Sequence, residues 1–166
     1  MPAESVRHRA YLCLGSNVGD RAGTMAEALE RLADAGVTIA ARSSLYETPP
    51  WGPVPQGPYL NQVVEVSSPL GPHDLLALAL GVERELGRDR SREVRYGPRR
   101  IDIDILWMDG HMLDEEDLQI PHPRILERAF VLVPLAEIAP ELKISGMAVA
   151  EAVKRLDTAD ITRFPG

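Results

Sequence analysis

The sequence predicts an α+β domain whose elements follow the order β-α-β-β-α-β, which is typical of a ferredoxin-like split βαβ sheet. Three observations lead to this prediction. Residues 101–105, Ile-Asp-Ile-Asp-Ile, alternate with the period of a strand that has one dry face. Two segments, 20–35 and 72–86, repeat apolar residues at helical spacing, and a glycine follows each. Three apolar strand-like runs complete the order. Residues 9–14 precede the first helical segment, and residues 37–44 and 59–67 lie between the two helical segments.

The two helical segments carry clear apolar stripes. In the first, Met25, Leu29 and Leu32 share a face; in the second, Leu75 and Val82 do. We therefore expect both helices to pack on one face of the sheet.

Two further segments are expected outside the core elements: a proline-rich loop and a C-terminal helix. Residues 46–58 contain five prolines, so this segment is expected to be a stiff irregular loop without helix or strand. Residues 147–156 carry Val149, Ala152 and Val153 at helical spacing, which predicts a C-terminal helix as an extension of the fold. We expect a single domain over residues 1–166, with its core in 9–142.

Composition limits the possible functions. The 166 residues carry a formal charge of −7, which argues against general binding to nucleic acid or a membrane surface. Cys13 is the sole cysteine, so neither an internal disulfide nor a cysteine-based zinc site is possible. Residues 1–9 lack the apolar core of a signal peptide, and no apolar run is long enough to span a bilayer. We expect a cytoplasmic protein.

An acidic pair lies next to an arginine-rich run. Asp102 and Asp104 share the polar face of the 101–105 strand, about 7 Å apart between Cα atoms, and a divalent cation would relieve their repulsion. Mg²⁺ suits such oxygen ligands. Residues 87–100 hold six arginines against two acidic residues, a local charge of +4 that predicts an anion site. The alternative is an amphipathic strand with a solvated face beside a solvated loop; finding both features together favours a site for phosphoryl-type transfer.

The phosphate-binding side chains are expected to be arginines. The chain has no G-x-x-x-x-G-K-[ST] loop, and its two lysines lie near the C-terminus. Thr48, Pro49, Pro50 and Trp51 offer a wall for a flat ligand, although a plain surface loop explains them equally well. Tyr59 and Asn61 share a strand face, and a ring with an amide is suited to reading a heterocycle.

Five motifs in sequence order resemble one family. They are Gly15-Ser16-Asn17, Tyr46-Glu47-Thr48-Pro49-Pro50, Tyr59-Leu60-Asn61, Gly97-Pro98-Arg99 with Asp102-Ile103-Asp104, and Pro121-His122-Pro123-Arg124 through Arg128-Ala129-Phe130. The chain resembles the 6-hydroxymethyl-7,8-dihydropterin pyrophosphokinases from about Tyr11 to Leu142. The resemblance implies transfer of the β,γ-diphosphate of ATP to the hydroxymethyl oxygen of the dihydropterin in folate biosynthesis, with AMP as the leaving group.

The resemblance also implies roles for single residues. Asp102 and Asp104 would hold two Mg²⁺ ions, and with Arg88 and Arg99 they would form the catalytic set. The pterin would be held by Thr48, Pro49 and Trp51, by Asn61 at its polar edge, and by the rings of Tyr59 and Phe130. The residues implied for ATP are Glu83, Arg88, Arg90, Tyr96, Arg99, Ile105, His122 and Arg128.

Two positions depart from the family pattern. Leu80 and Pro123 stand where some members carry Gln and Tyr.

Two other functions are alternatives to this one. A palm-type nucleotidyltransferase would use a similar acidic pair but release pyrophosphate instead of AMP. An RNA-binding module is disfavoured by the acidic charge and by the lack of an aromatic pair on adjacent strands. The expected partners are small-molecule substrates, with no nucleic acid and no membrane, and the chain is expected to be a monomer.

Overall fold

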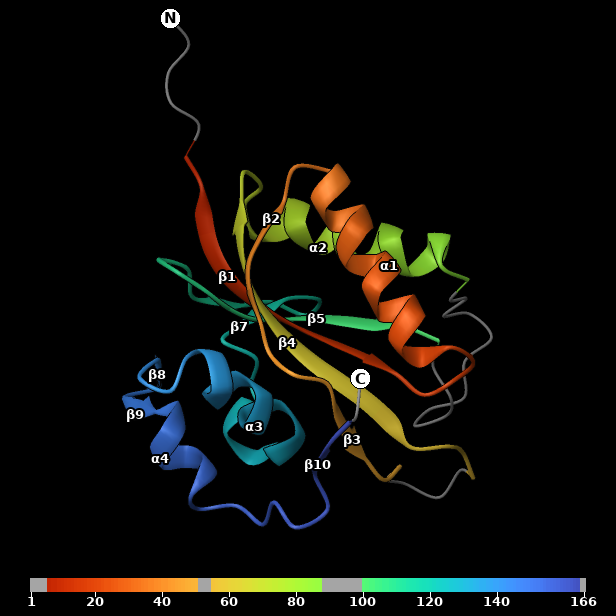
Figure 1. Cartoon of the computed structure of the whole chain (residues 1–166). Coiled ribbons are helices and arrows are strands. Elements are labelled where there is room, and N and C mark those ends of the chain that lie inside the picture. The colour runs from red at the N-terminus through yellow and green to blue at the C-terminus, as the bar shows by residue number, and fades with distance from the viewer. Residues whose placement is uncertain (1–5, 51–54, 88–99, 165–166) are drawn as a thin grey trace, which may run out of the picture.

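The fold is a mixed α/β structure built on an antiparallel sheet (Figure 1). A computed structural model of the chain describes residues 6–50, 55–87 and 100–164. The main strands are β1 (His8–Ser16), β2 (Thr38–Arg42), β3 (Tyr46–Thr48), β4 (Tyr59–Ser68), β5 (Asp102–Met108) and β10 (Thr162–Arg163). In the described parts they form one sheet in the order β10-β3-β4-β1-β5, and β2 pairs with β4 beyond the end of β3.

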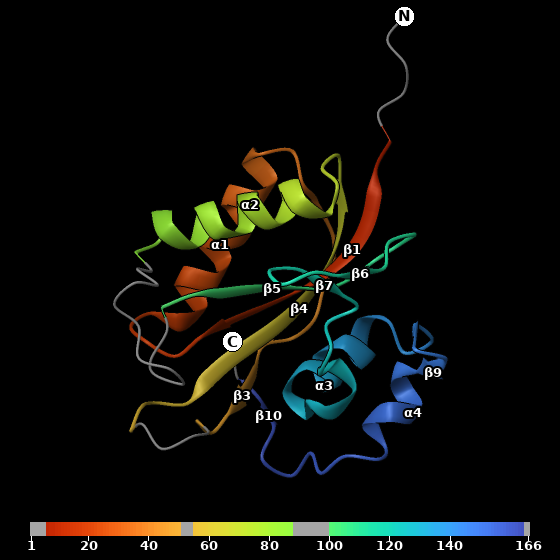
Figure 2. The same cartoon turned by 180° about the vertical axis from the view of Figure 1, so that it is seen from behind.

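Helices α1 (Arg21–Asp34) and α2 (Pro72–Glu85) lie together on one face of the sheet (Figures 1 and 2). The Asp20 side chain caps α1 by accepting a hydrogen bond from the Gly23 N–H at 3.1 Å, and Pro72 begins α2 with its favoured φ. Their apolar stripes bury against the alternate residues of the strands, among them Leu12, Leu14 and Ile103. Both helices are therefore where the helical periodicity predicted them.

The other face is covered by residues 125–156. Helices α3 (Ala129–Ile138) and α4 (Val149–Val153) pack there with the 3-10 turn η2 (Ile125–Glu127), against Tyr11, Cys13 and other side chains of this face. Two small hairpins complete the fold, β6 (Leu113–Asp114) with β7 (Gln119–Ile120), and β8 (Lys143–Ile144) with β9 (Met147–Ala148). No helix in the described ranges is both long and apolar enough to cross a bilayer.

Two predicted segments differ from the structure. Residues 46–48, expected to be irregular, form β3, because they precede the first proline and the side chains of Tyr46 and Thr48 are buried where they pair with β4. The C-terminal helix is shorter than residues 147–156. Ser145 and Gly146 have φ values of 52° and 83°, which make a tight hairpin turn, so residues 147–148 pair as β9 before α4 begins.

Candidate active site

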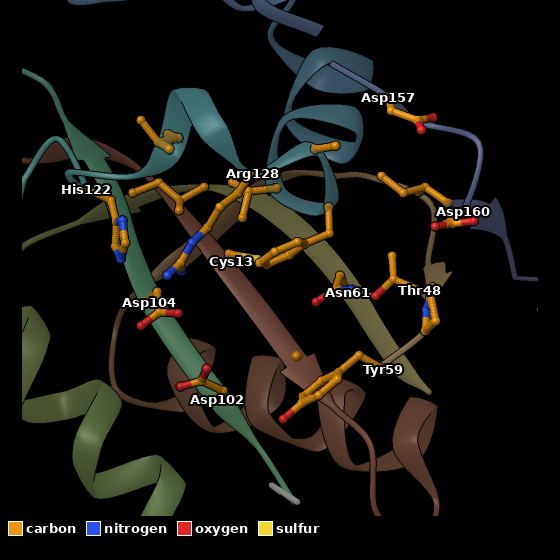
Figure 3. A pocket seen from close by; sticks show the side chains of 18 residues that line it. Cys13, Thr48, Tyr59, Asn61, Asp102, Asp104, His122, Arg128, Asp157 and Asp160 are labelled. Atoms are coloured by element: carbon orange, nitrogen blue, oxygen red, sulfur yellow. Dashed lines mark hydrogen bonds between the residues drawn. The ribbon is translucent and has the colours of Figure 1, made fainter. Parts of the chain in front are cut away.

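A pocket of about 420 Å³ opens on the sheet face that α3 covers only in part (Figure 3). That volume suits a small-molecule ligand. Strands β1, β3, β4 and β5, the η2–α3 segment and the C-terminal residues all contribute to the wall. The lining comprises Cys13, Gly15, Thr48, Pro49, Tyr59, Asn61, Asp102, Asp104, Leu106, His122, Ile125, Arg128, Ala129, Phe130, Val131, Asp157, Asp160 and Ile161.

The sheet register places an acidic group and an amide at opposite sides of the pocket floor. Asp102 of β5 pairs with Gly15 of β1, and Gly15 pairs in turn with Asn61 of β4. Two strand spacings of about 4.8 Å separate Asp102 from Asn61 by about 10 Å between Cα atoms. Because Gly15 has no side chain, the space above this part of β1, between Asp102 and Asn61, is left open.

Asp102 and Asp104 point to the same side of β5, both half-buried, as their alternation with isoleucine predicted (Figure 3). Ile103 and Ile105 face the core under α1 and α2. Two carboxylates on one strand face are a suitable donor set for Mg²⁺, which keeps several waters and takes substrate phosphates as further ligands. The described residues contain no group of three or more His, Cys, Asp or Glu that would complete a metal site from protein alone.

The Asn61 amide is oriented by a neighbour. Its Nδ2 donates to Thr48 Oγ1 at 3.1 Å, and a Cβ placed on Gly15 would lie 3.3 Å from its Oδ1. Asn61 is 4 % exposed, so little motion is open to the amide. The Oδ1 acceptor is thereby held at the pocket floor, next to the ring of Tyr59.

Arg128 and His122 lie at the side of the pocket that holds Asp104 (Figure 3). Burial lowers the pKa of His122, as do the charges of Arg128 and Arg124, while Asp102 opposes them. The imidazole is therefore neutral at neutral pH. Its Nδ1 accepts from the Arg124 N–H at 3.3 Å, which leaves the proton on Nε2 as a donor. The Arg128 guanidinium lies 5.7 Å from the centre of the Phe130 ring.

Cys13 lies in the pocket floor but is not a nucleophile. Burial raises the pKa of its thiol well above the usual value, and the charges of Asp104 and Asp102 add to this effect. The thiol stays protonated, so Cys13 serves as a small apolar floor residue.

The pocket geometry can be compared with known proteins. The family model of 7,8-dihydro-6-hydroxymethylpterin-pyrophosphokinase (HPPK) matches residues 11–140, most of the chain. The chain belongs to the HPPK family.

Individual relatives agree with this assignment. The 2-amino-4-hydroxy-6-hydroxymethyldihydropteridine pyrophosphokinase of Methylorubrum extorquens is 51% identical over 93% of this chain and 98% of its own length. The enzyme of the same name from Bacillus subtilis is 47% identical over 81% of this chain and 80% of its own length. A crystal structure of Plasmodium falciparum HPPK-DHPS with pterin and p-hydroxybenzoate has a TM-score of 0.69 and 18% identity, which shows the shared fold. That match covers 93% of this chain and 42% of the solved chain, so this chain spans less than half of that protein.

The structure brings together most of the described residues that the HPPK resemblance implied. Asp102 and Asp104, the proposed ATP contacts His122 and Arg128, and the proposed pterin contacts all line one pocket; the pterin set is Thr48, Pro49, Tyr59, Asn61 and Phe130. Trp51, Arg88, Arg90, Tyr96 and Arg99 lie outside the described residues.

Glu83 and Ile105 are not among the lining residues. Ile105 is buried in the core under α1 and α2, on the face of β5 opposite the two aspartates. Glu83 is 1 % exposed, and its Oε2 accepts a hydrogen bond from the Ile103 backbone N–H at 2.8 Å. Contacts of these two side chains with ATP therefore stay a prediction from the resemblance alone.

The sequence reasoning missed several lining residues. Cys13 was not singled out as a lining residue; it is buried, and its position two residues before Gly15 puts both on one strand face. Asp157, Asp160 and Ile161 belong to the C-terminal segment, which has no periodic pattern. Their placement depends on how that segment returns to the sheet, which no local signal reveals.

Proposed function

We propose that this pocket transfers the β,γ-pyrophosphoryl group of ATP to the hydroxymethyl oxygen of 6-hydroxymethyl-7,8-dihydropterin, the folate-pathway reaction of the HPPK family. The bond between the β-phosphorus and the oxygen that bridges it to the α-phosphorus breaks, and this oxygen stays on the α-phosphate. The new bond joins the β-phosphorus to the hydroxymethyl oxygen, whose proton is released, and AMP leaves. The supporting observation is the row Asp102–Gly15–Asn61, in which a carboxylate and an amide lie about 10 Å apart across the pocket floor.

The pterin occupies the Asn61 side of this row. Tyr59 from β4 and Phe130 from α3 line the same pocket and provide faces for a flat ring. The Asn61 Oδ1, held by the Thr48 contact, accepts a hydrogen bond from a ring N–H. Pro49 provides an apolar wall at the end of β3, and Trp51 is proposed to extend it.

The triphosphate occupies the Asp102 and Asp104 side. The two carboxylates fit Mg²⁺ because they share one strand face and one pocket, and two ions are proposed there. Bound Mg²⁺ would neutralise charge on the phosphate oxygens. Arg128 adds a positive charge at this side, and the Nε2–H of His122 is placed to donate to the nucleotide. Arg88, Arg90, Arg99 and Tyr96 are proposed to complete the ATP site, with Glu83 and Ile105 nearby.

Pyrophosphoryl transfer depends mainly on alignment and charge compensation. The pocket residues provide both: the ring-binding side chains fix the hydroxymethyl group, and the cationic groups offset the triphosphate charge. A strong general base is not required by this account.

The order β5-β1-β4-β2, with α1 and α2 on one face, supports a ferredoxin-like split βαβ core. We propose that residues 1–166 act as one monomeric cytoplasmic domain.

The test is incubation of the protein with ATP, Mg²⁺ and 6-hydroxymethyl-7,8-dihydropterin. We expect one AMP for each pterin diphosphate, and no AMP when the pterin is left out. Asp102→Asn and Asp104→Asn should each lower kcat at least 100-fold without loss of folded structure, because each removes one anionic oxygen ligand. Asp117→Asn, an exposed acidic residue outside the pocket, is the matched control. Release of pyrophosphate in place of AMP would favour a palm-type nucleotidyltransferase and contradict the proposal.

A further inference from the structure

The C-terminal strap, residues 156–164, runs from the end of α4 back to the sheet beside the pocket (Figure 1). Its end pairs with β3, with Thr162 opposite Glu47 and Arg163 opposite Tyr46. The Phe164 N–H donates to the Leu45 carbonyl at 2.8 Å, and the Ile161 N–H donates to the Thr158 carbonyl at 3.1 Å. The strap is thus held at its sheet end and within its own turn.

A carboxylate on α3 reinforces this attachment. Glu137 accepts hydrogen bonds from the Tyr46 hydroxyl and from the N–H and hydroxyl of Ser44, and lies 3.6 Å from the Arg163 guanidinium. Burial alone would raise the pKa of Glu137, but these hydrogen bonds lower it on balance, so the carboxylate is ionised and holds its partners. The strap, β3 and α3 therefore form one unit around the pocket.

The strap adds Asp157, Asp160 and Ile161 to the pocket wall. Asp157 Oδ1 accepts from the Ala159 N–H at 2.9 Å, so part of its hydrogen-bonding capacity is used locally. For Asp160, no side-chain hydrogen bond or ion pair is found among the described residues. Figure 3 shows its carboxylate on the Thr48 side of the pocket, opposite Asp102 and Asp104.

The charge distribution decides what this side of the pocket can bind. A triphosphate is attracted to the side with Arg128 and the cation-binding aspartates, whereas the strap carboxylates would repel it. Their oxygens are instead suited to N–H donors. The relatives' substrate is a 2-amino-4-hydroxy-pteridine, whose amino group offers such donors at the ring end remote from the hydroxymethyl group.

We propose that Asp160 is a specificity-determining residue that accepts a hydrogen bond from the 2-amino group of the pterin. This inference rests on the proposed function. It assigns a role in substrate recognition to a segment that lies beyond residues 11–140, the part matched by the family model.

Equilibrium calorimetry tests the inference with two ligands, the pterin substrate and its analogue without the 2-amino group. For the wild-type protein we expect the analogue to bind about tenfold more weakly than the pterin, equivalent to about 1.4 kcal/mol. In Asp160→Ala the pterin Kd should rise about tenfold and the analogue Kd should stay within twofold, so that the preference disappears. Asp160→Asn, which keeps an acceptor oxygen, should lose only part of the preference, and Kd for ATP·Mg²⁺ should not change.

Asp117→Asn serves as the matched control, since it removes an exposed carboxylate of the same kind outside the pocket. A general weakening of both ligands in Asp160→Ala, with the tenfold preference intact, would overturn the assignment and leave Asp160 as a wall residue. Because Kd is measured without turnover, this result is separate from a failure to form AMP, which would count against the proposed function.

Discussion

Removing the Glu83 carboxylate should loosen β5, the strand that carries the proposed magnesium ligands Asp102 and Asp104. Among the residues that the structure describes, β5 is the last strand on its side of the sheet, and the Ile103 N–H donates to Glu83 Oε2 at 2.8 Å rather than to another strand. Glu83 is 1 % exposed, so in Glu83→Ala no bulk water replaces the lost acceptor. A buried donor left without a partner costs about 1–3 kcal/mol, and a hydrogen bond to a charged acceptor lies at the upper end of that range.

We therefore expect Glu83→Ala to lower the free energy of unfolding by about 2–3 kcal/mol. Glu83→Gln keeps an acceptor oxygen of the same reach, so its cost should be about 1 kcal/mol. Urea denaturation followed by circular dichroism measures both values. Glu83→Ala should be less stable than Glu83→Gln, because only the Ala variant leaves the Ile103 N–H without an acceptor.

The same change should reduce activity, because Ile103 lies between Asp102 and Asp104. A shift of about 1 Å at these carboxylates is enough to lower kcat/KM by about 100-fold. AMP formation at raised Mg²⁺ should recover part of the loss if cation affinity is what fell. A Glu83→Ala protein within 0.5 kcal/mol of wild type would refute the reasoning about the edge strand.

Two further predictions follow from the pocket. In Gly15→Ala the new Cβ lies 3.3 Å from Asn61 Oδ1 and takes up space at the pocket floor. KM for the pterin should therefore rise about tenfold, while KM for ATP stays unchanged. Equal changes in the two KM values would contradict the proposal that the pterin and the triphosphate occupy opposite sides of the pocket. Burial and Arg128 lower the pKa of His122, so the unfolded chain binds its proton more tightly, and the free energy of unfolding should fall as pH drops below about 6.5. His122→Gln should reduce this pH dependence in thermal unfolding between pH 5 and 8, and identical slopes for both proteins would refute the buried, neutral state of His122.

Local periodicity was sufficient to predict the strands that form the pocket floor. Alternation along residues 101–105 placed Asp102 and Asp104 on one face because strand side chains repeat every two residues. The same rule placed Tyr59 and Asn61 together on β4. These predictions succeeded because they depend on residues within one strand, where geometry leaves a single choice.

Predictions that depended on distant partners were incomplete. Nothing in the sequence around Glu83 shows that its carboxylate is buried against the Ile103 N–H, which lies 20 residues away. The strap residues Asp157 and Asp160 reach the pocket only because β10 pairs with β3. Such contacts are set by tertiary pairing, which local propensity does not contain.

The pocket itself results from small side chains at the centre of the sheet. β1 is flanked by β4 and β5, and its residues opposite Asp102 and Asp104 are Gly15 and Cys13. Leucine or valine at these two positions would fill the space between the aspartates and Asn61, as Leu12 and Leu14 fill the opposite face under α1 and α2. One strand thus serves two purposes: its large residues pack against the helices, and its small residues leave the space of the pocket.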